Sequence, residues 1–138
     1  MSVEKAAEEA RRWLATAEDD LHTARILFEN KKFAQCCFFC QQAAEKAVKS
    51  LYYAVDADPW GHSVFKLLES RPDQFAGGGA FSTLIDDARR LDQYYIPTRY
   101  PNGLPGTLPS QTYSANDGSW AIDAATKIVT SVQQVLGS

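Results

Sequence analysis

The sequence predicts an all-α fold, an antiparallel four-helix bundle with an additional short helix and a long proline-rich loop before the last helix. Apolar residues recur at alternating spacings of three and four over several long stretches, the period of an amphipathic helix. No stretch has the pattern of a convincing strand, and there is no internal repeat. With 138 residues and 45% hydrophobic content, the chain can bury one core but is short for two, so residues 1–138 are expected to form a single domain.

The charge balance limits the partners that the chain can hold. A net charge of −3 and a pI near 5.3 argue against a surface-wide grip on nucleic acid, so RNA is possible only through a local contact and is not favoured. No run of roughly 18 apolar residues suits a membrane span, and the amino terminus is charged where a secretory signal would be apolar. We therefore expect a cytoplasmic protein that makes no membrane contact.

Three cysteines lie close together, at Cys36, Cys37 and Cys40. An odd number at this spacing does not form a disulfide framework. Cys37 and Cys40 have the spacing of a redox pair or of half a zinc site, but no second pair of cysteines or histidines lies at ligand distance in the sequence. We expect free, buried thiols, with no metal and no cofactor.

Two long helical patterns fill the first part of the chain, separated by a polar break at residues 30–32. The first begins near Ala10, and its apolar stripe is Leu14, Ala17, Leu21, Ala24 and Phe28. The second has one stripe of Phe33, Cys37, Cys40, Ala44, Ala47, Leu51 and Ala54, and another of Cys36, Phe39, Ala43, Val48, Tyr52 and Val55. A helix that is apolar on two sides is either central in its bundle or faces another subunit.

Shorter elements follow Pro59, which ends the second helix because proline disfavours helical geometry in the preceding residue. A short helix is predicted through Val64, Leu67 and Leu68. The glycine-rich residues 76–80 are expected to be a flexible connection. A third main helix then runs from Phe81 to Leu91, or as far as Tyr95.

Four prolines exclude regular helix from the loop 96–116, and a loop of that length is usually functional or disordered. Asn116, Asp117 or Ser119 can cap the final helix. The stripe of that helix is Ile122, Ala125, Val129, Val132 and Leu136.

The most informative segment is residues 91–103, which combines three tyrosines, two prolines and one arginine. The prolines restrict the backbone around Arg99, whose guanidinium can then be pre-positioned for a phosphate or a carboxylate. A salt bridge that pins the loop to the bundle is an equally good interpretation. Tyr94, Tyr95 and Tyr100 can stack a base, although at least one of them is expected to close the core.

Two lysines and a histidine are further candidates for a ligand site. Lys46 and Lys49 lie three apart on the second helix and can meet phosphates if that helix lines a cleft, whereas a solvated charged edge is the simpler interpretation. His62 can cap backbone donors or hydrogen-bond a carboxylate. A single histidine with no carboxylate or second histidine nearby in the sequence gives only weak support for a catalytic role.

Several segments, in this order and spacing, carry a family likeness: ARRWL at residues 10–14 with Asp20-Leu21, Cys37-Phe38, QAAEKAVK at 42–49, GHS at 61–63, and Leu91-Asp92 with YIPTRYP at 95–101. Together they resemble the HEPN family, named for nucleotide binding in higher eukaryotes and prokaryotes. The likeness covers nearly the whole chain. It is closest to small stand-alone prokaryotic members and to the carboxy-terminal domain of sacsin.

The resemblance implies a helical homodimer with a cleft between its subunits, and a small nucleotidyltransferase as a frequent partner of prokaryotic members. Many members are ribonucleases or toxins of toxin–antitoxin pairs, marked by an arginine and a histidine with four to six residues between them. No histidine follows Arg99, so this mark is absent, and with it the proton-transfer partner of ribose attack.

Our hypothesis from the sequence is a HEPN homodimer that binds a nucleotide such as ATP or GTP, or a similar anionic ligand, between its subunits. The candidate contacts are Arg99, Tyr95, Tyr100, Tyr94, Lys49, Lys46 and His62. We expect weak catalysis or none. The alternatives are a ribonuclease in which His62 replaces the missing histidine, and a pure protein-interaction module.

Overall fold

The computed structural model describes residues 2–100, 104 and 106–137, and every regular element within them is a helix. Three long helices form most of the bundle: α1 (Val3–Glu29), α2 (Phe33–Ala54) and α6 (Ala115–Leu136). Five shorter elements complete it: α3 (Val64–Glu69), the 3-10 turns η1 (Asp73–Phe75) and η2 (Phe81–Leu84), α4 (Ile85–Asp92) and α5 (Pro109–Thr112). The all-helical class is confirmed.

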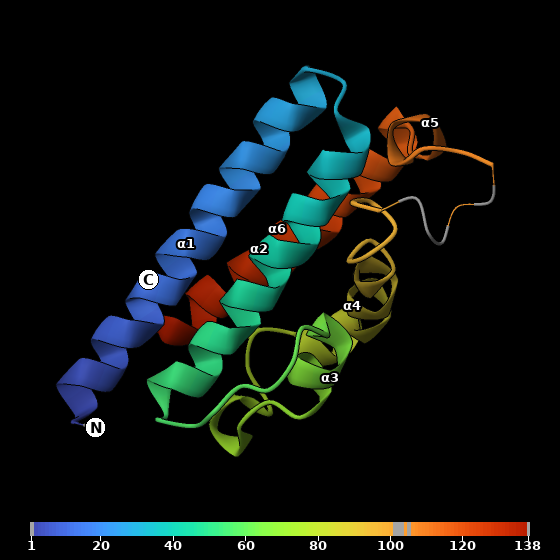
Figure 1. Ribbon diagram of the computed structural model, residues 1–138. Coiled ribbons are helices and arrows are strands. Elements are labelled where there is room, and N and C mark those ends of the chain that lie inside the picture. Colours follow the sequence, from blue (N-terminus) through green and yellow to red (C-terminus); the bar gives the residue numbers. More distant parts are fainter. Residues whose placement is uncertain (1, 101–103, 105, 138) are drawn as a thin grey trace.

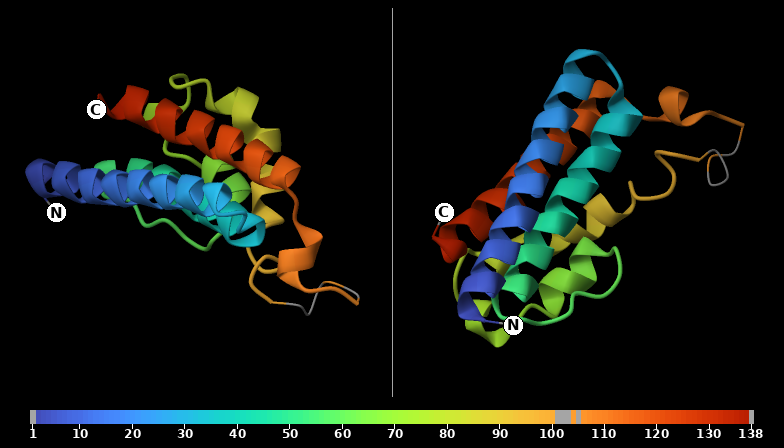
Figure 2. Two further views of the ribbon diagram at one scale, coloured as in Figure 1. Left: turned by 90° about the horizontal axis from the view of Figure 1, so that it is seen from above. Right: turned by 60° about the vertical axis from the view of Figure 1, so that its left-hand side comes forward.

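The arrangement places α2 in the centre (Figure 1). α1 and α2 run antiparallel, joined by a tight turn in which Lys31 has a positive φ of 60°. α6 packs against this pair, as both views of Figure 2 show, and α3 and α4 lie together on the other flank of α2. None of the described helices is long and apolar enough to cross a membrane.

The two apolar sides of α2 are explained by this central position. Residues of both predicted stripes are buried, because α2 contacts α1, α6, α3 and α4 within the same chain. Phe39, which belongs to the second stripe, is partly buried against the core. The second stripe is therefore accounted for without a second subunit.

Three element boundaries differ from the sequence prediction. α1 starts at Val3 because the Ser2 hydroxyl accepts a hydrogen bond from the Lys5 amide at 3.1 Å, and Ala6 extends the buried stripe toward the amino terminus. The predicted third main helix is shorter: Ala80 has a left-handed backbone, η2 follows it, and α4 ends at Asp92. The third main helix of the expected bundle is thus a 3-10 turn followed by two turns of α-helix.

The start of the last helix also differs. Ser114 caps α6, and its amide and hydroxyl donate to the Asp117 carboxylate at 2.9 and 3.1 Å. Asp117 therefore takes part as the third residue of the capping box, and neither Asn116 nor Ser119 is the cap. α5 lies inside the loop predicted to lack helix, because Pro109 occupies its first turn, where a missing amide hydrogen is harmless.

Small and large residues alternate along the buried face of α1. Ala10, Leu14, Ala17, Leu21 and Ala24 are all buried, which confirms the predicted stripe. Ala17 has no exposed surface at all. A site of this kind has no room for a larger side chain unless its neighbours move.

We predict that Ala17→Leu lowers the free energy of unfolding by about 1–3 kcal/mol, because three added carbon atoms must enter a close-packed core. Chemical denaturation monitored by circular dichroism measures this. The control is Ala15→Leu, which lies two residues away on an exposed part of α1 and should change stability by less than about 0.5 kcal/mol. Equal effects of the two substitutions would contradict the assigned packing.

Candidate functional site

The carboxylate of Asp92 holds the start of α3. It accepts hydrogen bonds from the Ser63 hydroxyl at 2.6 Å, the Val64 amide at 2.8 Å and the Phe65 amide at 3.1 Å. These amides belong to the first turn of α3, which has no partners of its own for them. Asp92 thus connects the end of α4 to the beginning of α3.

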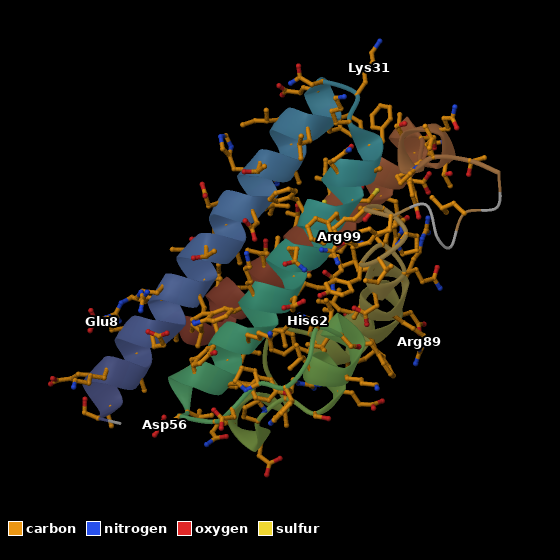
Figure 3. All side chains as sticks on the ribbon, in the orientation of Figure 1. Glu8, Lys31, Asp56, His62, Arg89 and Arg99 are labelled. Carbon is orange, nitrogen blue, oxygen red and sulfur yellow. The ribbon has the colours of Figure 1, made fainter. Side chains whose placement is uncertain are left out.

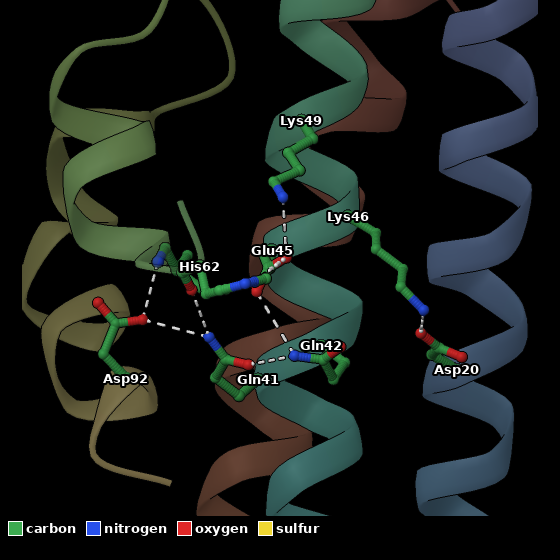
Figure 4. Close-up of polar contacts among 9 residues, drawn as sticks. Asp20, Gln41, Gln42, Glu45, Lys46, Lys49, His62 and Asp92 are labelled. Carbon is green, nitrogen blue, oxygen red and sulfur yellow. Dashed lines mark hydrogen bonds and ion pairs between the residues drawn. The ribbon is translucent and has the colours of Figure 1, made fainter. Parts of the chain in front are cut away.

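A chain of polar side chains on α2 continues from this contact (Figure 4). The Gln41 amide donates to the His62 carbonyl at 2.8 Å and lies 3.4 Å from Asp92. Gln42 donates to the Gln41 side-chain oxygen at 2.8 Å and lies 3.4 Å from Glu45. Gln41 is completely buried, and no buried side-chain nitrogen or oxygen within the described ranges lacks a partner. The network is therefore satisfied throughout.

Glu45 is the charged centre of this network and is only 3% exposed. Its Oε2 atom lies 3.1 Å from the Lys49 ammonium and 3.4 Å from Nδ1 of His62. A carboxylate in this position favours the tautomer of His62 with hydrogen on Nδ1, which leaves Nε2 free to accept a proton. The His62 ring itself is exposed.

Aromatic rings link His62 to Arg99. The His62 ring stacks on Tyr95, with ring centres 5.0 Å apart, and the Arg99 guanidinium carbon lies 4.8 Å from the centre of the same tyrosine. The guanidinium also lies over Phe38 at 4.5 Å and Tyr100 at 5.2 Å. Figure 3 shows His62 and Arg99 on one face of the molecule. These two residues, 37 positions apart in the sequence, therefore share one aromatic cluster.

Arg99 has no carboxylate partner within the described parts of the chain. Its Nε donates to the Tyr95 carbonyl at 3.1 Å, and the three rings hold the planar group in place. The salt bridge considered from the sequence is absent from these residues. Arg99 is exposed, and its two terminal nitrogens make no hydrogen bond to any described residue.

The other predicted contacts take different positions. Tyr94 is buried, 6% exposed, with an edge contact to Tyr113 and a tilted contact to Trp120, and burial raises its pKa to about 12. It closes the core, as one tyrosine was expected to do. Lys46 pairs with Asp20 at 2.6 Å, and Lys49 pairs with Glu45 and lies over Trp13. The lysines thus form ion pairs and not a solvated edge, and their charge is already balanced.

The three cysteines are free and buried, as expected. Burial raises the pKa of Cys37 above its ordinary value. A hydrogen bond between Cys36 and Cys40 lowers the pKa of Cys36. The same hydrogen bond, together with burial, raises the pKa of Cys40. Within the described residues, no group of three or more histidine, cysteine or acidic side chains is placed to hold a metal ion.

Sequence reasoning missed the polar residues that organise this region. Asp92 and Glu45 were noted only as parts of longer segments, and Gln41 was not noted. A signal existed for Glu45 and Lys49, which lie four apart on one helix in the order that favours an ion pair. For Asp92 there was none, because its partners lie about thirty residues away in the chain.

The comparisons with known proteins agree on one family. The family model described as HEPN domain matches residues 10–135. The chain is similar to the crystal structure of TT1696 from Thermus thermophilus, with 36% identity, a TM-score of 0.85, and coverage of 91% of this chain and 97% of that one. No curated protein matches.

Two further solved structures are similar. ST0689, described as an archaeal HEPN homologue, has 31% identity and a TM-score of 0.75, and the match covers 92% of this chain and 97% of that one. The HEPN domain protein TM0613 from Thermotoga maritima has 29% identity and a TM-score of 0.66, with 91% of this chain and 98% of that one covered.

We predict that Asp92→Ala lowers the free energy of unfolding by about 2–3 kcal/mol, because it removes a charged acceptor from a hydroxyl and two helix-start amides. Equilibrium denaturation measures the loss. The control is Asp86→Ala on the same helix. The Asp86 side chain is 92% exposed and pairs only with Arg89, so that change should be worth about 0–1 kcal/mol. A loss from Asp92→Ala as small as that of the control would show that the contact does not organise the region.

Proposed function

The chain belongs to the HEPN family, and from this membership we propose that it binds a nucleotide or a similar anionic ligand through Arg99. One observation carries the proposal. The Arg99 guanidinium is held over three aromatic rings and is not neutralised by any described carboxylate. A fixed, planar, uncompensated fork of donors is suited to phosphate.

Neighbouring groups support a nucleotide in particular. Tyr100 is exposed, so its ring can pack against part of a nucleotide. The Tyr95 ring is half-buried and already contacts His62 and Arg99. His62 lies on the same cluster and adds a group that can donate to phosphate when protonated. Lys46 and Lys49 are not included among the contacts, since their ammonium groups are already paired.

The proposed assembly is a homodimer whose cleft contains this face, with a nucleotidyltransferase as the partner protein. The exposed apolar residues around Arg99 support an interface here: Ile96, Tyr100 and Leu108. Sedimentation analysis of the purified protein, alone and mixed with a nucleotidyltransferase encoded beside it, tests both parts. A monomer at all concentrations that ignores such a partner would contradict the assembly.

We predict that Arg99→Ala weakens the binding of ATP or GTP by about 1.5–3 kcal/mol, the usual range for hydrogen bonds to charged groups. Arg99→Lys should recover only part of this, because an ammonium keeps the charge but not the planar fork. Titration calorimetry on the folded protein measures both variants.

The matched control is Arg89→Ala. Arg89 also lies over a ring, Phe65 at 4.4 Å, but its charge is paired with Asp86 at 2.7 Å, so its loss should leave binding unchanged. No saturable binding of either nucleotide at millimolar concentration would refute the proposal. If Arg99→Ala instead sharply lowers the melting temperature without ligand, Arg99 is a structural pin for the loop.

A second candidate function, ribonuclease activity, is favoured by the contact between His62 and Glu45. With Nδ1 of His62 facing the carboxylate, Nε2 can take the proton of a ribose 2′-hydroxyl while that oxygen attacks phosphorus. The 5′-oxygen then leaves and takes a proton from water, which gives a cyclic phosphate and a 5′-hydroxyl. Arg99, on the same tyrosine, can stabilise the charge that develops on the phosphate oxygens.

If this candidate is correct, the protein cleaves single-stranded RNA in the presence of a metal chelator and leaves the corresponding DNA intact. His62→Ala should then reduce the rate by roughly a hundredfold or more, the usual contribution of a general base. His22→Ala, an exposed histidine on α1, should not change it. Cleavage that survives His62→Ala would exclude this mechanism.

A further inference from the structure

A hollow of approximately 440 Å³ lies beside Arg99 and is lined by Gln35, Thr98, Arg99, Leu108, Pro109 and Ser110. Gln35 lies three residues before Phe38 on α2, so both project from one side of that helix. The Arg99 guanidinium covers Phe38 and also lines the hollow. A ligand bound to Arg99 through a phosphate can therefore extend into this space.

The lining has the composition of a site for a small planar group. Leu108 and Pro109 supply apolar surface. The Thr98 hydroxyl is already occupied, because it donates to the Tyr94 carbonyl. The Gln35 amide, on an exposed residue, makes no hydrogen bond to any described residue, and neither does the hydroxyl of Ser110. An open hollow with a largely apolar lining and a few unengaged polar groups can hold a small planar group.

We propose that this hollow binds the base of a nucleotide whose phosphate is held by Arg99, and that Gln35 selects adenine. The inference rests on the proposed nucleotide binding. A glutamine amide presents one donor and one acceptor in a plane, which matches the N7 acceptor and the N6 donor of adenine. Guanine presents two acceptors, N7 and O6, along the same edge, so the glutamine oxygen would face another oxygen.

Binding of ATP, GTP and inorganic tripolyphosphate to the whole protein, measured by titration calorimetry, separates the base from the phosphate. The wild-type protein should bind ATP about tenfold more tightly than GTP, within the usual discrimination of one bidentate amide contact. Gln35→Leu should remove this preference and leave the affinity for tripolyphosphate unchanged. Gln35→Glu should also weaken ATP, because a carboxylate lacks the donor.

The control is Gln134→Leu, at an exposed position of α6, which should preserve the preference for ATP. If ATP binds with the help of Arg99 but Gln35→Leu leaves the ratio of ATP to GTP affinity unchanged, the base subsite is wrong and the proposed function stands. If the wild-type protein binds ATP and GTP equally, adenine selection by Gln35 is refuted. If neither nucleotides nor tripolyphosphate bind, both proposals fail together.

Discussion

The geometry of the candidate site depends on a single carboxylate. Asp92 ends α4, and the groups that it binds begin α3, so it fixes the two chain segments that carry the site. His62 immediately precedes its hydroxyl partner Ser63, and Arg99 follows seven residues after Asp92. Gln41 and Glu45 then hold His62 against α2, where Arg99 lies over Phe38. The contact of Asp92 that caps α3 thereby also helps to determine that His62 and Arg99 meet at the surface.

The second constraint is the buried charge of Glu45. Removing a carboxylate from water costs several kcal/mol unless partners replace the solvent, and here Lys49, His62 and Gln42 surround it. The buried Glu45 also affects which cations are available to bind an anion. The sequence analysis named the Lys49 ammonium as a candidate phosphate contact. In the structure Glu45 already neutralises it. Because the chain as a whole carries a net charge of −3, anion binding at this face then depends on Arg99, which has no carboxylate partner among the described residues.

The helices could be predicted from the sequence because they depend on the periodicity of apolar residues. Contacts between residues far apart in the chain could not be predicted. The three long helices and the short one were identified in the right order, because their buried faces repeat at helical spacing, although the starts of α1 and α6 were not located. The capping box of Ser114 and Asp117 was visible as a serine with an acid three residues later, yet later residues were preferred. Arg99 and Tyr95 stood out through local composition. Their connection to His62 could not be predicted, because it arises from the bond of Asp92 to a distant turn.

The partners of the arginines distinguish a structural role from a functional one. Arg12 and Arg89 pair with Glu9 and Asp86 on their own helices, which holds the side chain but cancels its charge. Aromatic rings hold Arg99 equally well and leave its charge intact, because a ring face attracts a cation without carrying a net negative charge. A guanidinium fixed in this way loses little conformational freedom when an anion arrives, so more of the interaction energy appears as affinity. Electrostatics and rigidity therefore favour the same residue as the anchor of the site.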